Sequence, residues 1–296
     1  YEILIGLVGS EMCIRDRYQI LQCYMVFGGI PFYLSLINAK ESLVQNVDRL
    51  FFAQGGIMRS EFDELYNALF SNADLYISVV KGLAAHHDGM SREEISKATG
   101  ITGGTLTRVL TNLERCDFVS RNQNFAHKVK DTIYRLVDFY TLFYYKFILP
   151  DVSGDEQWWS HHFESRQVST WQGLTFEIVC LMHTDSIKRA LGISGMATEV
   201  SSWRKAATDG QNGGQIDLVI KRADRIIHLC EMKFSKSQYR ITEAYEQLLR
   251  QRLELFQSST KTRFSLVITF VTTYGIADGL HHSLVHSEVT MEQLFI

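Results

Sequence analysis

The fold of the second half of this 296-residue chain is decided by two apolar segments, Gln215-Ile-Asp-Leu-Val-Ile220 and Arg225-Ile-Ile-His-Leu-Cys-Glu-Met-Lys-Phe234. Each segment is short, rich in aliphatic residues and bounded by polar residues, which is typical of a β-strand. The polar stretch Lys221-Arg-Ala-Asp224 joins the two segments. The pattern therefore predicts a β-hairpin.

The segments around this hairpin predict a sheet covered by helices. A helix containing Phe176-Glu-Ile-Val-Cys180 precedes the hairpin. A helix from about Thr242 to Gln257 and the strand Phe264-Ser-Leu-Val-Ile-Thr-Phe-Val271 follow it. Because helices before and after a sheet can cover its two faces, we expect an α/β sandwich.

Three charged side chains interrupt these apolar strands, although an isolated buried charge is costly unless it is paired or bound to a metal ion. Side chains alternate along a strand, so Glu231 and Lys233 point to one face. Cys230 and Met232 point to the other face, into a core. Asp217, on the paired strand, can reach the face of Glu231. We therefore expect two carboxylates and an ammonium group to converge on one spot.

This grouping of charges suits phosphodiester hydrolysis. Mg²⁺ is held in proteins by one or two carboxylates, with phosphate oxygens and water completing its shell. The metal acidifies a water molecule and neutralises developing negative charge, and a lysine can hold the attacking water. Residues 221–263 carry ten Lys and Arg against five Asp and Glu, a surplus that attracts a phosphate backbone. The sequence therefore predicts DNA as a partner and Mg²⁺ or Mn²⁺ as a cofactor held by Asp217 and Glu231.

The spacing Asp217-x(13)-Glu231-x-Lys233 resembles the core motif of the PD-(D/E)XK nuclease superfamily, which includes restriction endonucleases and Holliday-junction resolvases. The resemblance covers roughly residues 165–296. It implies a restriction-endonuclease-like α/β sandwich with a central mixed sheet, in which all three motif residues are catalytic. Glu177, on the preceding helix, matches an additional acidic residue found in many members. Ile216 stands where the motif's proline would be.

Other roles remain open for the same residues. Glu231 and Lys233 can also form a buried ion pair in an inactive sandwich. Glu177 can be solvated, or paired with Lys188 or Arg189, as a helix glutamate often is. Metal-dependent DNA cleavage is therefore one hypothesis. Its alternative is a DNA- or protein-binding module with an inactive nuclease-like domain.

Residues 73–149 predict helices and a small hairpin. The stretch Ser91-Arg-Glu-Glu94 forms a capping box that opens a helix, and Ile101-Thr-Gly-Gly104 supplies the turn that follows that helix. The next helix, Thr105–Arg115, has one apolar face. That face consists of Leu106, Val109, Leu110 and Leu113.

Two short extended segments, Phe118-Val-Ser-Arg-Asn-Gln123 and Thr132-Ile-Tyr-Arg-Leu-Val137, follow the second helix. The arrangement resembles a winged helix, whose recognition helix meets DNA phosphates or base edges. The outward residues of that helix would be Thr105, Arg108 and Asn112. A protein contact or a rigid spacer is the alternative, because the segment is only mildly basic.

The aromatic segment 138–149 predicts core or interdomain packing, since its apolar residues occupy more than one helical face. Base stacking is the alternative. The following stretch, Pro150-Asp-Val-Ser-Gly-Asp155, is rich in turn residues and predicts a linker over residues 150–164.

Nearer the start, Gly28-Gly29-Ile30-Pro31-Phe32-Tyr33-Leu34 suits a turn that opens a helix, and helical periodicity continues to residue 72. The stretch resembles the helical lid that follows the nucleotide-binding core in a family of prokaryotic AAA-type ATPases, which often carry a nuclease-like domain at the C-terminus. A small helical bundle is the plainer interpretation of residues 18–72. The phosphate-binding string G-x-x-x-x-G-K-[ST] does not occur in this sequence. The resemblance therefore implies that ATP binds to an upstream domain, and we expect no ATPase activity from this chain.

The first 17 residues end in Leu7-Val-Gly-Ser-Glu-Met-Cys-Ile-Arg-Asp-Arg17, which resembles a translated sequencing adapter. We therefore leave residues 1–17 out of the fold prediction. The composition, 46% hydrophobic and 21% charged, is that of a folded protein. The five cysteines form no C-x-x-C pair, and no apolar run approaches the roughly 18–20 residues of a membrane span. We expect a cytoplasmic protein that does not associate with membranes.

Overall fold

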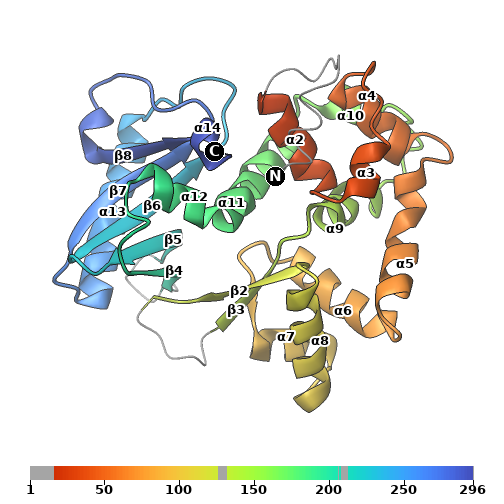
Figure 1. Ribbon diagram of the computed structural model, residues 1–296, viewed down its shortest axis with the longest axis horizontal. Helices are drawn as coiled ribbons and strands as arrows, with labels where there is room; N and C mark the ends of the chain where they lie inside the picture. The colour runs from red at the N-terminus through yellow and green to blue at the C-terminus, as the bar shows by residue number, and fades with distance from the viewer. Residues whose placement is uncertain (1–16, 126–131, 206, 208–212, 296) are drawn as a thin grey trace. The chain divides into compact units, whose positions relative to one another are not determined.

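A computed structural model describes residues 17–125, 132–205, 207 and 213–295 (Figure 1). The protein is of the mixed α/β class and divides into two compact units. The first unit contains the chain up to Arg121 together with Ile133–Thr175, and the second contains Asn122–Thr132 and Phe176–Ile296. Within the described ranges, no helix is long and apolar enough to cross a membrane. Our expectation for residues 1–17 falls almost wholly outside these ranges, apart from Arg17, which opens the first described helix.

The N-terminal part of the first unit is helical, as predicted. Gly28 ends the first described helix in a left-handed conformation, with φ of +67°, which a glycine adopts at little cost. Pro31 then opens the next helix, where its missing amide hydrogen is not needed. The elements of this part are α2 (Arg17–Phe27), α3 (Pro31–Ser35), α4 (Leu43–Val47), the π-helical segment η1 (Asp48–Phe52), α5 (Ile57–Leu69) and α6 (Ala73–Ala84).

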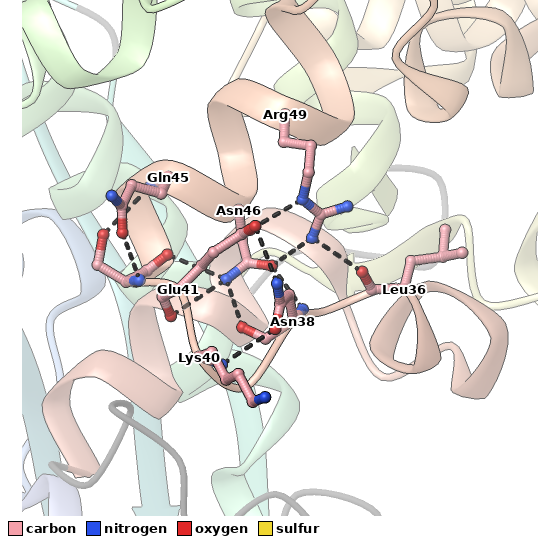
Figure 2. Close-up of polar contacts among 8 residues, drawn as sticks. Leu36, Asn38, Lys40, Glu41, Gln45, Asn46 and Arg49 are labelled. Atoms are coloured by element: carbon pink, nitrogen blue, oxygen red, sulfur yellow. Dashed lines mark hydrogen bonds and ion pairs between the residues drawn. The ribbon is translucent and has the colours of Figure 1, made fainter.

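The loop between α3 and α4 is organised by the buried side chain of Asn46 (Figure 2). Its amide oxygen accepts from the backbone amide of Asn38 at 2.7 Å, and its amide nitrogen donates to the carbonyl oxygen of Asn38 at 3.0 Å. Arg49 donates to Glu41 at 2.8 Å and to the carbonyl oxygen of Leu36 at 3.1 Å. The network thus satisfies buried polar groups of the loop with partners nearby in sequence.

The helices and the hairpin predicted for the middle of the chain are present. Helix α7 (Arg92–Thr99) begins at the predicted capping box and ends at Gly100, which has a positive φ. Helix α8 (Gly103–Arg115) buries its four predicted apolar residues. The strands β1 (Met90–Ser91), β2 (Val119–Gln123) and β3 (Thr132–Leu136) form a sheet in the order β1-β3-β2.

The aromatic segment packs in the core of the first unit, as predicted. It forms α9 (Phe139–Phe143) and the π-helical segment η3 (Tyr144–Ile148). Phe143 and Phe147 are buried, and the centroids of their rings lie 5.1 Å apart. Packing therefore explains the high aromatic content without an exposed stacking surface at these two rings.

The linker prediction for residues 150–164 is wrong. The segment contains α10 (Trp158–His162) and belongs to the first unit. Trp159 is 1% exposed, and its backbone amide donates to the carboxylate of Asp48 at 2.8 Å. The turn-forming residues do lie in an irregular stretch, but the aromatic residues that follow them are anchored by packing. A buried tryptophan removes too much apolar surface from water to lie in a free linker.

The second unit is built on a five-stranded mixed sheet in the order β4-β5-β6-β7-β8 (Figure 1). The pairings β4–β5 and β5–β6 are antiparallel, whereas β6–β7 and β7–β8 are parallel. The predicted hairpin and the predicted central mixed sheet are therefore confirmed. The strands are β4 (Thr198–Lys205), β5 (Gly214–Arg222), β6 (Ile226–Lys233), β7 (Ser265–Thr272) and β8 (Val285–Thr290).

Helices cover the sheet of the second unit. Helix α13 (Glu243–Thr260) connects β6 to β7. Its residue Phe256 belongs to one apolar core of the sheet, and its residue Leu249 belongs to the other. Helix α11 (Arg166–Met182) precedes the strands, and the ring of Phe176 lies 5.6 Å from that of Phe234. The unit also contains the short helices α12 (Thr184–Ala190) and α14 (Met291–Leu294) and the 3-10 helix η4 (His282–Leu284). The order is therefore two helices, three antiparallel strands, helix α13 and two strands that run parallel to β6.

The last residues of β2 and the two that follow them, Asn122–Phe125, belong to the second unit. The backbone amide of Phe125 donates to the carbonyl oxygen of Ser202 on β4 at 2.6 Å. The ring of Phe125 also packs on Phe256, with 5.0 Å between the ring centroids. This end of the hairpin is therefore engaged with β4 and α13.

Candidate functional site

The predicted site lies where β5 and β6 separate. The pairing of these strands runs from Lys221 opposite Ile227 to Leu218 opposite Cys230, and it ends there. Asp217 on β5 and Glu231 on β6 are the next residues beyond the last pair, so they face each other where the two strands begin to separate. The openings between neighbouring strands are common ligand sites in open α/β sheets.

A second irregularity lies on the other side of β5. The register between β4 and β5 shifts between Ser201 and Trp203, which pair with Val219 and Ile216 respectively. Asp217 lies within this shift. Bulges of this kind can re-aim a side chain and are frequent beside active sites. Asp217 therefore lies outside the regular pairing of β5 with both of its neighbours, β4 and β6.

Glu231 is 9% exposed, and both of its carboxylate oxygens are held by side chains. Its Oε1 accepts from Nη1 of Arg252 at 2.6 Å, and its Oε2 accepts from the hydroxyl of Tyr245 at 2.7 Å. Nζ of Lys233 lies 3.7 Å from the same Oε2. Two cations and a hydroxyl therefore offset the cost of burying this carboxylate.

Helix α13 positions Tyr245 and Arg252 over the sheet. These residues share one helical face with Leu249 and Phe256, because all four recur at spacings of three or four residues. Leu249 and Phe256 are buried and anchor this face. The hydroxyl of Thr242 caps the helix by accepting from the backbone amide of Tyr245 at 3.3 Å. The apolar anchors and the cap thus fix where the two polar side chains meet Glu231.

Tyr245 links Glu231 to Lys233. Its hydroxyl donates to the carboxylate, and Nζ of Lys233 lies 4.9 Å from the centroid of its ring. Burial and, after it, the charge of Glu231 raise the pKa of the Tyr245 phenol. The phenol therefore stays protonated and remains a donor, while its ring attracts the ammonium group.

The charges of both carboxylates of the predicted site act on the guanidinium group of Arg252. Burial acts to lower the pKa of Arg252, but the charge of Glu231, the hydrogen bond to it and the charge of Asp217 raise that pKa overall. Asp217 is half-buried, and its Oδ1 accepts from the side-chain amide of Gln215 at 3.0 Å. The structure thus brings Asp217, Glu231 and Lys233 into one region, with Arg252 among them.

The oxygen donors of this region are of the kind that Mg²⁺ and Mn²⁺ prefer. In the part of the chain that the structure describes, no three His, Cys, Asp or Glu side chains gather as a metal-binding group. The predicted site contributes two carboxylates, those of Asp217 and Glu231. Such a pair fits a magnesium ion that takes its other ligands from phosphate and water.

Glu177 is half-buried on α11, one helical turn before the buried Cys180. After burial, the charge of Glu177 and the nearby Cys230 raise the pKa of the Cys180 thiol. Cys230 precedes Glu231 on β6, so their side chains point to opposite faces. The role of Glu177 as a fourth acidic residue of the site, which the resemblance implies, therefore stays a prediction.

The residues predicted to contact DNA on α8 divide into two kinds. Thr105 and Arg108 are exposed, as predicted. The outward orientation predicted for Asn112 is wrong, because its half-buried side chain donates to the hydroxyl of Tyr76 at 2.8 Å. Helical spacing gives Asn112 the face of Arg108, but α6, which contains Tyr76, packs against α8 at this point.

Tyr245 and Arg252 are site residues that our sequence analysis missed. A signal for them exists, since both interrupt the apolar face of a helix that carries Leu249 and Phe256. A charged residue on such a face requires a buried partner. The identity of that partner is a matter of tertiary packing.

A groove lies beside Arg252. It runs between the start of β5 and α13, and its polar lining includes Lys205, Gln215, Gln251 and Arg252. Neither the protein-family models nor the curated proteins compared with this chain match it. The function of the region therefore has to follow from its own geometry.

Proposed function

We propose that the second unit hydrolyses phosphodiester bonds of DNA with a divalent metal ion, in the manner of PD-(D/E)XK nucleases. The observation that carries this proposal is the position of Asp217 and Glu231 at the opening between β5 and β6, with Lys233 beside Glu231. The order of helix, three antiparallel strands, helix and parallel strand gives further support.

Each residue has a chemical role in this proposal. Asp217 and Glu231 would hold the Mg²⁺ or Mn²⁺ ion, which when bound acidifies water and offsets negative charge. Lys233 would donate a hydrogen bond to the attacking water or to the phosphate. The oxygen of water forms a bond to phosphorus, and the bond from phosphorus to the leaving ester oxygen breaks. The proton lost by water passes to solvent or to that leaving oxygen.

We further propose that residues 73–137 form a winged helix that contacts DNA through Thr105 and Arg108. The order of helix α6, strand β1, helices α7 and α8 and the β2–β3 hairpin supports this interpretation. Residues 18–72 would then be the helical lid of a DNA-associated AAA-type ATPase, whose nucleotide site lies outside this sequence.

The test of the nuclease proposal is a cleavage assay on supercoiled, linear and branched DNA, with Mg²⁺, with Mn²⁺ and with chelator. We expect cleavage that requires the metal and that Asp217→Asn abolishes. The matched control is Asp224→Asn, which removes the same charge from the turn between β5 and β6. Cleavage by Asp217→Asn at the wild-type rate would contradict the proposal.

A specific observation favours a second candidate, a DNA- or protein-binding module that does not cleave. Both oxygens of Glu231 already have partners, so the carboxylate is satisfied by Tyr245 and Arg252 without a metal ion. Manganese binding separates the two candidates. A nuclease requires an affinity for Mn²⁺ that Asp217→Asn removes, whereas a structural ion pair requires none.

A further inference from the structure

Arg252 occupies a distinctive place in the candidate site. Its guanidinium group lies 2.6 Å from Glu231, and the charge of Asp217 also acts on it. These are the two carboxylates that would hold a divalent cation. The positive charge of Arg252 therefore already lies beside the carboxylates that would bind the metal ion.

We infer that Arg252 stands in for the divalent cation in the metal-free protein and has to leave Glu231 when the metal binds. This inference rests on the metal-dependent function proposed above. Arg252 is then a positioning residue that keeps Glu231 ordered and sets the affinity for metal.

The surroundings of Arg252 allow this exchange without moving the helix. Its side chain is 30% exposed and lines the groove between β5 and α13, so the guanidinium has solvent into which it can swing. Leu249 and Phe256 keep the backbone of α13 on the sheet. Tyr245 donates to the other oxygen of Glu231 and can stay in place while Arg252 leaves.

Electrostatics gives the direction of the effect. A guanidinium and a divalent cation at the same carboxylate repel each other, and the low dielectric of a buried site strengthens that repulsion. The hydrogen bond between Arg252 and Glu231 is also lost when the metal takes that oxygen. Removing the guanidinium should therefore tighten metal binding, although a mutation that removes a structural ion pair usually weakens a site.

The first arm of the test measures Mn²⁺ binding by the electron paramagnetic resonance signal of the free ion. We expect Arg252→Met to bind Mn²⁺ at least about tenfold more tightly than the wild-type protein, because the competing charge is gone. Arg250→Met is the matched control. Arg250 lies on the same helix and pairs with Glu246 at 2.5 Å, so this variant loses the same charge and should bind like the wild type.

The second arm uses the wild-type protein and does not depend on the folding of a variant. Phenylglyoxal modifies accessible arginines, and mass spectrometry reports the modification of each residue. We expect Mn²⁺ to increase the modification of Arg252 several-fold, while that of Arg250 stays the same. In Asp217→Asn, the increase at Arg252 should disappear.

The outcomes separate this inference from the nuclease proposal. Equal Mn²⁺ affinity of the wild type and Arg252→Met, with no change at Arg252 in the second arm, overturns the inference even if DNA is cleaved. Tighter binding by Arg252→Met without any cleavage supports the inference and overturns the nuclease proposal. If neither protein binds Mn²⁺, both are overturned.

Discussion

Two of the buried ionisable side chains on strand β6, those of His228 and Glu231, have very different surroundings. His228 is 2% exposed and lies where β6 pairs with Ile220 on β5 and Val267 on β7. Its Nδ1 is 2.8 Å from the hydroxyl of Thr269. Burial and the charge of a nearby arginine lower the pKa of His228 to about 4, so the ring is neutral at pH 7.

Glu231, three residues further along, lies where the pairing with β5 has ended. It meets Arg252, Lys233 and the hydroxyl of Tyr245. His228 instead has the hydroxyl of Thr269 at Nδ1 and Nη1 of Arg222 at 3.2 Å from Nε2. Within a closed ladder, a buried ionisable group is held as a neutral part of the core. At the opening, two cations and a hydroxyl offset the cost of burying the Glu231 carboxylate. The difference supports the proposal that the functional site lies at the Glu231 end of β6.

The largest effect should come from Lys233. If the Glu231 end is catalytic, Lys233→Ala lowers DNA cleavage by at least about a hundredfold, because a transition-state contact is lost. Mn²⁺ binding and the folded structure should stay largely intact. Single-turnover cleavage measures the effect, and Lys236→Ala is the control, since it removes the same charge from an exposed position. An unchanged rate in Lys233→Ala would show that the Glu231 end is structural, like the His228 end.

The neutral state of His228 should appear as a dependence of stability on pH. The folded-state pKa of about 4 lies below the ordinary value of about 6.5 for histidine. The unfolded protein therefore binds more protons between these values, and stability falls as the pH drops from about 6.5 towards 4. At pH 7 the contribution is fully present.

We expect this loss to reach about 2–3 kcal/mol in the free energy of unfolding. Urea unfolding at several pH values measures it. His228→Asn cannot titrate and can still contact Thr269, so its stability should depend less on pH by that amount. The same pH dependence in wild type and variant would mean that the fold does not hold His228 neutral. The proposed difference between His228 and Glu231 would then be contradicted.

Tyr245→Phe should have a smaller effect on stability. The variant removes one hydrogen bond to Glu231 and keeps the ring beneath Lys233, so we expect a loss of about 1–2 kcal/mol. Tyr239→Phe, which removes a hydroxyl from a ring packed on that of Tyr245, is the control for losing a phenol nearby. Thermal and urea unfolding compare the two variants. A Tyr245→Phe protein as stable as the wild type would mean that another donor, such as water, replaces the Tyr245 hydroxyl at Glu231.

The smallest effect is expected at Arg108, which lies far from β6 in sequence and is exposed on α8. Losing one phosphate contact should weaken DNA binding a few-fold and reduce the slope of log affinity against log salt by roughly one unit. The cleavage rate at saturating DNA should not change. Fluorescence anisotropy at several salt concentrations measures the slope, with Lys81→Ala on α6 as the control. An unaltered slope would make α8 a spacer or a protein-contact element.

The sequence by itself determined the features that depend on local spacing. The capping box at Ser91 and Glu94 and the buried face of α8 follow from side chains three or four residues apart. The shared face of Glu231 and Lys233 follows from the alternation of a strand. The hairpin of β5 and β6 follows from two apolar runs joined by a polar turn.

The tertiary structure alone decided which side chains meet. Arg252 and Tyr245 reach Glu231 because α13 crosses back over the sheet between two parallel strands, β6 and β7. Asn112 donates a hydrogen bond to Tyr76, 36 residues away, because α6 packs on α8. Spacing gives the face of an element on which a residue lies. The element that covers that face is fixed by packing between segments distant in sequence, which local patterns do not encode.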